Sequence, residues 1–456
     1  MNYEKYYSKN IEKLYYFQNK LIHNFNKNNI IDFNISSEER INLTHLDVYS
    51  IDPENCEDVD DAFSYFEDNN KKYIVIHIAD PTDHIKLFSN EFNSIIEKSF
   101  TRYPSNRKPI HLMTKNILEK STLHENIYGN VKKALSLIIE FNENNELNYN
   151  NTIFYFTIIK VKSENKLSYN NVPQNNFVIK NCLKLSEFIF PNLIYNNSTK
   201  YEVKFKNNSP YFYKNNELEC KYKKMIAKFA IFSNNYIAYL LKKQLNNDHI
   251  IFRKCPVINS EELSKHSVNF NDFMYFILNN NISADYDNIN SNHDLLQLDE
   301  YLHMTSPIRR SVDCVIHYLL KSIYLNIKIP FNENEISTII NQSNIVNKKL
   351  KKIQFRDNKF RFLHALEKDL INHDVNYYKL QFYISSFKKP YLNIIIHQLN
   401  NESIYLSYTL KVNNNSINNN LINVYHNCFI NKVNCCNFYD EGSLPDLDLY
   451  ILSLLS

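Results

Sequence analysis

Glycine is almost absent from this chain, which has 456 residues and only two glycines, Gly129 and Gly442. Phosphate-binding loops need several glycines, because their backbone must approach the phosphate closely. Enzymes with Walker-type or dinucleotide-binding loops are therefore poor candidates. The heavy use of Asn, Ile, Lys and Tyr, whose codons are AT-rich, indicates an AT-rich genome. A hydrophobic content of 44% is typical of globular proteins, and the length predicts one large domain with smaller appendages.

The densest group of charges is acidic and lies within residues 51–63. This segment has no lysine or arginine, and its carboxylates are Asp52, Glu54, Glu57, Asp58, Asp60 and Asp61. Crowded carboxylates raise one another's pKa and repel unless a cation is shared between them. Oxygen ligands at this density suit Mg²⁺ or Mn²⁺ rather than zinc, which indicates phosphate chemistry. A solvated acidic turn is the alternative, and a calcium loop is a weaker one because its glycine and twelfth-position glutamate are missing.

An apolar, β-rich run at 72–79 follows the acidic segment and stops at Asp80-Pro81. It predicts a buried strand, so the acids should lie at the edge of a core. His77 within the run is expected to be a satisfied core histidine, whereas Asp80 and Asp83 either extend the acidic site or end the strand. The same criteria predict strands at 135–141 and 152–161 and helices at 223–243, 313–324 and 349–374.

Two adjacent arginines, Arg309 and Arg310, end a second informative segment. Ser306 suits a helix N-cap and Pro307 the first helical position, so a helix is predicted to begin there with both arginines in its first turn. The helix dipole disfavours cations at that end, and a phosphate would compensate for this. The alternative is a pair of surface arginines partnered by Asp313 or other carboxylates.

The ends of the chain differ from its middle. Residues 1–43 are predicted to be a helical extension that is too short for a folded nucleic-acid-binding module. In 386–456, short strand-like runs alternate with Asn-rich turns, for example at 413–415 and 418–420, which suits a small β-barrel. Eight scattered cysteines without a CxxC spacing predict free thiols rather than a structural zinc site.

The net charge of +3 neither demands nor excludes a nucleic-acid partner, so any binding track must be a local patch. There is no signal-peptide pattern, and no uninterrupted apolar run approaches the ~18 residues that cross a membrane. The sequence therefore predicts an intracellular protein of a reducing compartment, cytoplasmic or organellar, without a membrane partner.

Taken together, these segments resemble the RNB family, the catalytic domain of RNase II and RNase R. The family's first signature is matched by Asp52, the run 58–62 (DVDDA) and the run 77–80 (HIAD). Its second signature is matched by 305–310 (TSPIRR) followed by Asp313 and His317. Weaker echoes lie between them in the same order, at 102–104, 166–169 and 234–238. The resemblance spans roughly residues 44–370.

The resemblance implies an α+β fold in which helices surround a mixed sheet, with an RNB catalytic domain over 44–385 and a degenerate OB-like β domain over 386–456. It also implies an enzyme, a processive 3′-to-5′ exoribonuclease that hydrolyses single-stranded RNA to nucleoside 5′-monophosphates with two Mg²⁺ ions, or Mn²⁺. DNA is not an expected partner. The metal ligands would be Asp52, Asp58, Asp60 and Asp61. Asp60 and Arg309 would be catalytic, and the RNA-binding residues would be Tyr103, Ser306, Arg309 and Arg310.

The chain departs from the family at positions that are expected to bind the terminal nucleotide of the RNA. Ala227 and Lys228 stand where the family carries a Glu-Glu pair, and Ser311 and Tyr318 replace a tyrosine and an arginine of the second signature. Residues 1–43 leave no room for the two cold-shock OB domains that normally precede the catalytic domain. These departures leave an alternative: a catalytically impaired RNB-fold protein that binds RNA or scaffolds a partner.

Overall fold

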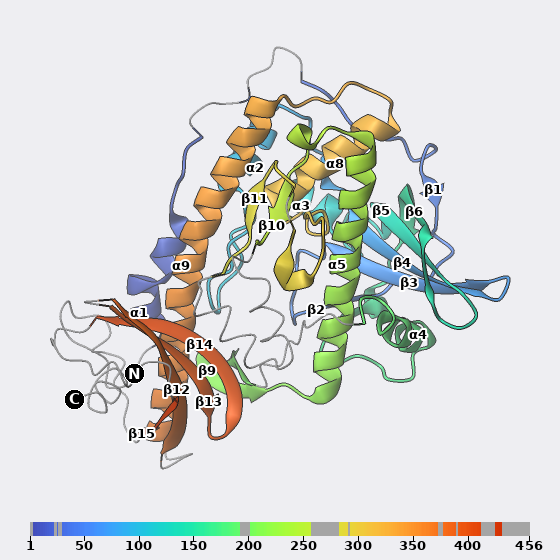
Figure 1. The fold of residues 1–456 in the computed structure, drawn as a ribbon. Helices are drawn as coiled ribbons and strands as arrows, with labels where there is room; N and C mark the ends of the chain where they lie inside the picture. The colour runs from blue at the N-terminus through green and yellow to red at the C-terminus, as the bar shows by residue number, and fades with distance from the viewer. Residues whose placement is uncertain are drawn as a thin grey trace.

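A computed structural model describes residues 3–21, 25, 30–191, 201–256, 282–290, 292–372, 377–388, 391–411 and 425–430. Its centre is a five-stranded mixed sheet in the order β1-β6-β5-β4-β3 (Figure 1). β3 (Asp61–Asp68), β4 (Lys71–Ala79), β5 (Val131–Phe141) and β6 (Leu147–Lys160) are antiparallel neighbours, and β1 (Ile41–Asn42) joins β6 in parallel. The three predicted strands and the predicted α+β class are confirmed.

His77 lies in β4, between β3 and β5, and is fully buried. Its Nε2 is 3.0 Å from Ser64 Oγ on β3, and its Nδ1 is 2.8 Å from Ser136 Oγ on β5. Burial lowers the pKa of His77 to about 3, so the ring is neutral and is satisfied by two hydroxyls. The expectation of a core histidine is confirmed.

Helices surround the sheet, and the longest, α9, runs along one side of the molecule (Figure 1). The helices are α2 (Asn90–Lys98), α3 (Lys115–Ser121), α4 (Phe177–Ser186), α5 (Glu217–Gln244), α8 (Ser311–Tyr324) and α9 (Glu333–Ile371). The helices predicted at 223–243 and 313–324 are confirmed, and the one predicted at 349–374 is confirmed as far as Ile371, since residues 373–374 lie outside the described residues. All three helices begin earlier than predicted. Asn216 and Asn332 cap the starts of α5 and α9, and Asn332 forms a capping box with Glu335.

The predicted start of a helix at Ser306 is wrong. Residues 306–309 form a turn, in which the Arg309 and Arg310 amides donate to the Ser306 carbonyl at 3.1 and 2.9 Å. Arg310 is extended and forms a β-bridge with Phe100, so α8 begins only at Ser311. Carboxylates from elsewhere accept the amides of the turn, which removes the need for a helix N-cap at Ser306.

Near the N-terminus, α1 (Tyr3–Asn10) and the 3₁₀ helix η1 (Glu12–Tyr16) pack beside α9 (Figure 1). The described residues between 17 and 40 form no helix. Beyond α9, β12 (Tyr378–Lys388), β13 (Tyr391–Leu399), β14 (Glu402–Lys411) and β15 (Tyr425–Ile430) form an antiparallel sheet in the order β14-β13-β12-β15. This sheet begins before the expected boundary at 385/386. The Asn runs 413–415 and 418–420 and residues 431–456 lie outside the described residues, so the OB-like domain stays a prediction.

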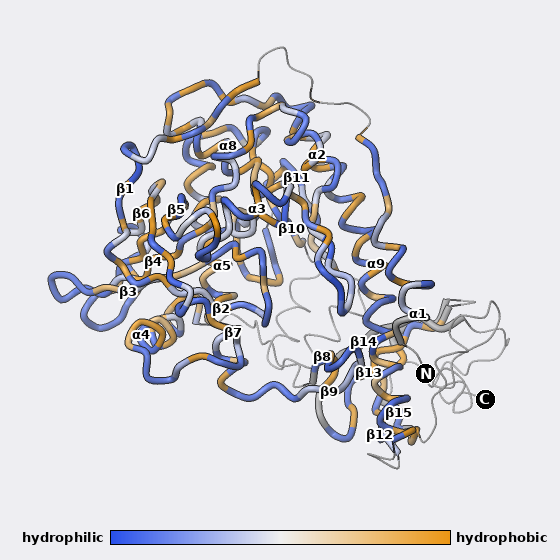
Figure 2. The backbone as a smooth tube through the Cα atoms, turned by 180° about the vertical axis from the view of Figure 1, so that it is seen from behind, coloured by the Kyte–Doolittle hydropathy of each residue, from blue (hydrophilic) through white to orange (hydrophobic). Residues whose placement is uncertain are grey.

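Short paired strands complete the described fold: β2 (Ser50–Asp52) with β7 (Lys166–Ser168), β8 (Tyr201–Lys206) with β9 (Ser209–Lys214), and β10 (Phe252–Lys254) with β11 (Asp285–Asp287). Hydrophobic residues gather in the strands of the large sheet, and the tips of its hairpins are hydrophilic (Figure 2). No helix in the described ranges is both long and apolar enough to cross a membrane.

Asparagine takes the place of glycine in most left-handed turns. Among the described residues, ten of the 14 non-glycine residues with positive φ are asparagines, for example Asn55 in the acidic segment and Asn106 in the loop after α2. Asparagine tolerates this region better than other side chains, so a chain with two glycines can still make tight turns.

Candidate active site

The acidic segment connects β2 to β3, with Asp52 as the last residue of β2 and Asp61 as the first of β3. Asp52 is in register with Ser168 of β7, and Asp61 with Ile78 of β4. The Asp60 carbonyl accepts the Ala79 amide at 2.8 Å, which fixes the end of the segment to the central sheet. The acids therefore lie at the edge of the core, as predicted, and not on a solvated tail.

Arg309 reaches Asp60 from the turn before α8. Its Nε is 2.5 Å from Asp60 Oδ2, and the Ile308 amide donates to Asp60 Oδ1 at 2.7 Å. The Asp60 side chain has 0% exposure, whereas that of Arg309 has 42%, so the guanidinium faces open space. Burial raises the pKa of Asp60 to about 7, and Arg309 and the Ile308 amide act against this rise. The acidic and basic segments predicted from sequence thus meet in one place.

Tyr103 reaches Asp58 from another direction. Its hydroxyl donates to Asp58 Oδ2, and the Cys56 thiol lies 3.5 Å from Asp58 Oδ1. Burial and the Asp58 carboxylate raise the pKa of Tyr103 well above its usual value, so the hydroxyl is a neutral donor. Tyr103, an expected RNA ligand, therefore lies beside the carboxylates.

Among the residues that the structure describes, no side chain donates a hydrogen bond to the Asp52 or Asp61 carboxylate. Burial raises the pKa of Asp52 to about 8, with a further contribution from Asp61, and burial also raises the pKa of Asp61. Asp52 Oδ2 is buried and has no hydrogen-bond partner in the described part of the chain. Two crowded carboxylates with an unpaired buried oxygen are the surroundings in which a hard cation would relieve repulsion.

The donor set therefore fits Mg²⁺ or Mn²⁺ in its chemistry. The four aspartates do not converge on one point, however. Within the described ranges, no three His, Cys, Asp or Glu side chains are grouped so that they could hold a metal ion. Asp58 and Asp60 are instead turned to Tyr103 and Arg309.

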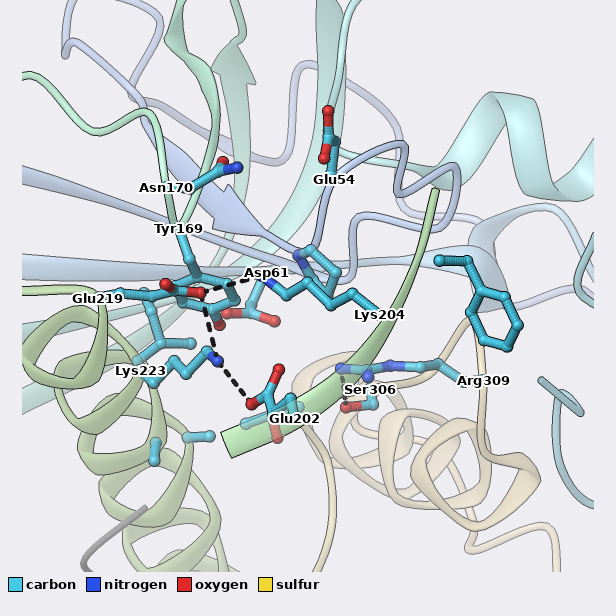
Figure 3. A pocket seen from close by; sticks show the side chains of 16 residues that line it. Glu54, Asp61, Tyr169, Asn170, Glu202, Lys204, Glu219, Lys223, Ser306 and Arg309 are labelled. Carbon is cyan, nitrogen blue, oxygen red and sulfur yellow. Dashed lines mark hydrogen bonds and ion pairs between the residues drawn. The ribbon is translucent and has the colours of Figure 1, made fainter. Parts of the chain in front are cut away.

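A cavity of about 600 Å³ opens beside Asp61 and Arg309. In Figure 3, Arg309 and Ser306 line one side of it, and Glu219 and Lys223 of α5 line the other. Lys223 Nζ lies 2.9 Å from Glu202 Oε1 and 3.5 Å from Glu219 Oε1, and Lys204 lies 3.6 Å from Glu219. The cavity thus has alternating charges and space for a nucleotide.

Four charged residues of the cavity were not predicted from the sequence: Glu202 and Lys204 of β8, and Glu219 and Lys223 of α5. In the sequence they look like ordinary surface charges, and only tertiary packing brings them together. Ala227 lines the cavity, but Lys228 points away from it and donates to the Ser186 carbonyl at 2.9 Å from a buried position. Neither residue replaces the carboxylates expected there.

Ser306 belongs to the site, since its hydroxyl accepts from Arg309 Nη2 at 3.0 Å. Arg310 is engaged elsewhere: its Nη2 lies 2.8 Å from Asp313 Oδ2, which also accepts the Ser306 amide at 2.8 Å. The geometry thus supports the alternative interpretation for Arg310, a partner of Asp313.

Asp80 and Asp83 lie in a separate buried ion-pair cluster. Asp80 contacts Arg40 at 2.7 Å and Lys321 at 3.0 Å, and Asp83 contacts the same two cations and Lys133. Burial raises the pKa of Asp80, but the charges of Lys321, Arg40 and His317 and the hydrogen bond from Arg40 together bring it below its usual value. These two carboxylates hold the end of β4 in place and have cations of their own.

Residues 40–326 match the sequence model of the RNB domain. Two proteins named exoribonuclease 2 from Buchnera aphidicola are each 28% identical to this chain. The match to that of subspecies Baizongia pistaciae covers 63% of this chain and 51% of the relative, and the match to that of subspecies Cinara cedri covers 69% and 56%. The chain therefore spans about half the length of the curated relatives that it matches.

Solved structures share the fold. An active-site mutant of the Dss1 exoribonuclease from Candida glabrata has a TM-score of 0.68 and 16% identity, covering 88% of this chain and 55% of that one. Mycoplasma genitalium RNase R in complex with double-stranded RNA has a TM-score of 0.66 and 16% identity, covering 88% and 76%. Yeast Ssd1, a pseudonuclease, has a TM-score of 0.62 and 14% identity, covering 81% and 51%.

Proposed function

This chain belongs to the RNB family, and on that premise we propose that it is a 3′-to-5′ exoribonuclease that hydrolyses single-stranded RNA to nucleoside 5′-monophosphates. The observation that carries the proposal is the contact between Arg309 and Asp60 at the edge of the cavity. It places a partly exposed guanidinium beside a group of buried carboxylates, as a phosphodiester-cleaving site requires.

Arg309 would bind the scissile phosphate. A guanidinium offers paired N–H donors to phosphate oxygens, and it stabilises charge that develops there as the bond breaks. Asp60 and Ser306 hold Arg309 in place, because its Nε and Nη2 donate to them. Tyr103 would contact the terminal nucleotide next to the reacting phosphate.

Two Mg²⁺ ions, or Mn²⁺, would be held by Asp52, Asp58, Asp60 and Asp61. Bound there, they would neutralise the carboxylates, make an attacking water more acidic and stabilise the leaving 3′ oxygen. Asp52 Oδ2, which has no hydrogen-bond partner among the described residues, and the raised pKa of Asp52 and Asp61 support this assignment. The protein's own contribution is to hold these carboxylates close together, where they repel anions until a cation binds.

A silent RNA-binding protein is the second candidate. Ala227 and Lys228 supply no carboxylate to the cavity, and the fold resembles that of the pseudonuclease Ssd1. Such a protein would keep the cavity and Arg309 for RNA binding without turnover.

An assay with end-labelled RNA separates the two. A single-stranded RNA labelled at either its 5′ or its 3′ end is incubated with the protein and Mg²⁺, beside a DNA of the same sequence. An exoribonuclease of this direction shortens the 5′-labelled RNA stepwise and releases the 3′ label at once as a mononucleotide, while the DNA persists. Retention of uncut RNA on the protein would favour the silent binder.

A further inference from the structure

An acidic residue outside the lining of the cavity joins the start of the chain to the loop that carries Tyr103. Asp357 lies on α9 and is 2% exposed. Its Oδ2 accepts the hydroxyls of Tyr7 at 3.0 Å and Tyr15 at 2.8 Å, and the Ser105 amide at 3.1 Å. Asp357 and the two tyrosines lie outside residues 40–326, the stretch that matches the RNB domain.

Arg102 makes a second connection between the same parts. Its Nη1 donates to the carbonyls of Tyr15 at 2.5 Å and Phe17 at 2.8 Å. The guanidinium also lies 3.9 Å from the centre of the Phe17 ring. Arg102 and Ser105 flank Tyr103 in the chain, so the residues on both sides of Tyr103 are held from outside the cavity.

Apolar contacts extend this support to the cavity itself. Tyr7, Ile11 and Tyr15 form a buried cluster with Leu350, Ile353 and Phe360 of α9. Phe100, Ile110 and Phe205 pack against it. Phe205 also lines the cavity beside Arg309. In addition, Asn106 donates to Asn208 in the turn between β8 and β9 at 3.1 Å.

We infer that residues 7–17, together with Asp357, position Tyr103 beside Asp58 of the acidic segment. The inference rests on the proposed RNA-binding role of the site. Asp357 Oδ2 accepts the Ser105 amide of the loop 102–107 and two hydroxyls of the N-terminal segment. Arg102 of the loop binds the same segment, so the loop is held at two points while the Tyr103 hydroxyl reaches Asp58. Without this support the loop could occupy other conformations, and RNA binding would have to select the competent one. Asp357 is thus a positioning residue, since it acts through Tyr103.

The test compares Asp357→Ala and Asp357→Asn with a matched control, Asp369→Asn. Asp369 is on the same helix and also accepts a tyrosine hydroxyl, from Tyr378 at 2.5 Å, but that tyrosine belongs to β12. Asparagine keeps one acceptor oxygen at position 357 without the charge, so it should fold even if alanine does not. Hydrogen exchange of the amides at 100–112 reports on the loop without any RNA. Both variants at 357 should exchange faster there, and the control should match the wild type.

The functional readout is the Kd of a single-stranded RNA with a free 3′ hydroxyl, measured in EDTA so that cleavage does not intervene. Loss of the charged hydrogen bonds should weaken binding roughly tenfold for Asp357→Ala and about threefold for Asp357→Asn. In a Tyr103→Ala background, neither change should weaken binding further, because the residue through which Asp357 acts is gone.

Additive effects of the changes at 357 and 103 would overturn the inference, and so would unchanged exchange at 100–112. If the wild type binds RNA and does not cut it, the enzymatic proposal fails but the positioning inference stands. If the wild type binds no RNA, both fail as accounts of function.

Discussion

Arg309 and Asp60 are 249 positions apart in the chain, yet their side chains form a hydrogen-bonded ion pair with an Nε to Oδ2 distance of 2.5 Å. The adjacent Ile308 amide donates to the other carboxylate oxygen, so both oxygens of Asp60 accept hydrogen bonds from the turn before α8. Arg309 retains substantial exposure toward the cavity. The pair therefore holds a cation in the wall of a cavity that is also lined by Lys204, Lys223, Glu202 and Glu219.

Replacing Arg309 should affect turnover more than binding. Arg309→Ala removes a donor that acts on the reacting phosphate, so kcat should fall about a hundredfold to a thousandfold. Arg309→Lys keeps the charge but loses the paired donors, so its loss should be intermediate. Steady-state kinetics on 5′-labelled RNA would measure both. A rise in KM with an unchanged kcat would show that Arg309 only binds the substrate.

Arg310 should behave differently from its neighbour. Asp313 has 0% side-chain exposure and relies on Arg310 and the Ser306 amide. Arg310→Ala should therefore lower the free energy of unfolding by about 2–3 kcal/mol, because a buried carboxylate loses its cation. Urea unfolding at neutral pH would test this. If Arg310→Ala were as stable as the wild type but bound RNA more weakly, Arg310 would be a phosphate ligand, as predicted from the sequence, and not a structural partner of Asp313.

The buried cluster beneath β4 should contribute to stability and not to catalysis. Lys321 is fully buried and contacts Asp80 at 3.0 Å and Asp83 at 3.2 Å. Lys321→Met should cost about 3–5 kcal/mol, since Asp80 and Asp83 each lose a buried cation and Asp80 keeps only Arg40. The exposed Lys328, just beyond α8, is a control, and Lys328→Met should leave the urea midpoint unchanged. Equal stability of the two variants would contradict the ion-pair assignment.

His77 should make the fold sensitive to acid. Burial lowers the pKa of His77 in the folded state to about 3, whereas the unfolded value is near 6.5. In the unfolded chain, His77 therefore binds a proton below about pH 6.5, whereas in the folded chain it stays neutral until about pH 3. This contribution to stability is complete above pH 6.5 and is lost as the pH falls toward 3.

Urea unfolding at neutral pH and near pH 4.5 measures how much the free energy of unfolding falls as His77 becomes protonated in the unfolded chain. The contribution of His77 to the loss should be roughly 2–3 kcal/mol. His77→Gln should reduce the difference between the two pH values by that amount, while the same change at the exposed His45 should not. An unaltered pH dependence in His77→Gln would rule out this role.

Periodicity predicted the elements well, because hydrophobic patterns report burial directly. The run at 72–79 became β4, and the apolar face of 313–324 became α8. The start of α8 was mispredicted because Ser306 has the chemistry of a cap, while the bridge between Arg310 and Phe100 depends on tertiary contacts. The same limit applies to Glu202 and Lys223, which meet only after β8 and α5 pack.

The meeting of the acidic segment with Arg309 was predictable only because both motifs resemble those of one family. Spacing alone left a solvated turn and a surface arginine pair as alternatives. The support of the Tyr103 loop by Asp357 was not predictable in this way, since it joins segments on either side of the family's domain.

The most direct test of the central claim compares metal-dependent RNA cleavage by the wild type and by Asp60→Asn. Wild type, Asp60→Asn and the exposed control Asp68→Asn would each be mixed with 5′-labelled single-stranded RNA, with and without Mg²⁺, and the release of nucleoside 5′-monophosphate measured. We predict that wild type and Asp68→Asn release it only with Mg²⁺, and that Asp60→Asn releases almost none while still folded. Equal release by Asp60→Asn and wild type would contradict the claim that the pair of Asp60 and Arg309 lies at the centre of the active site.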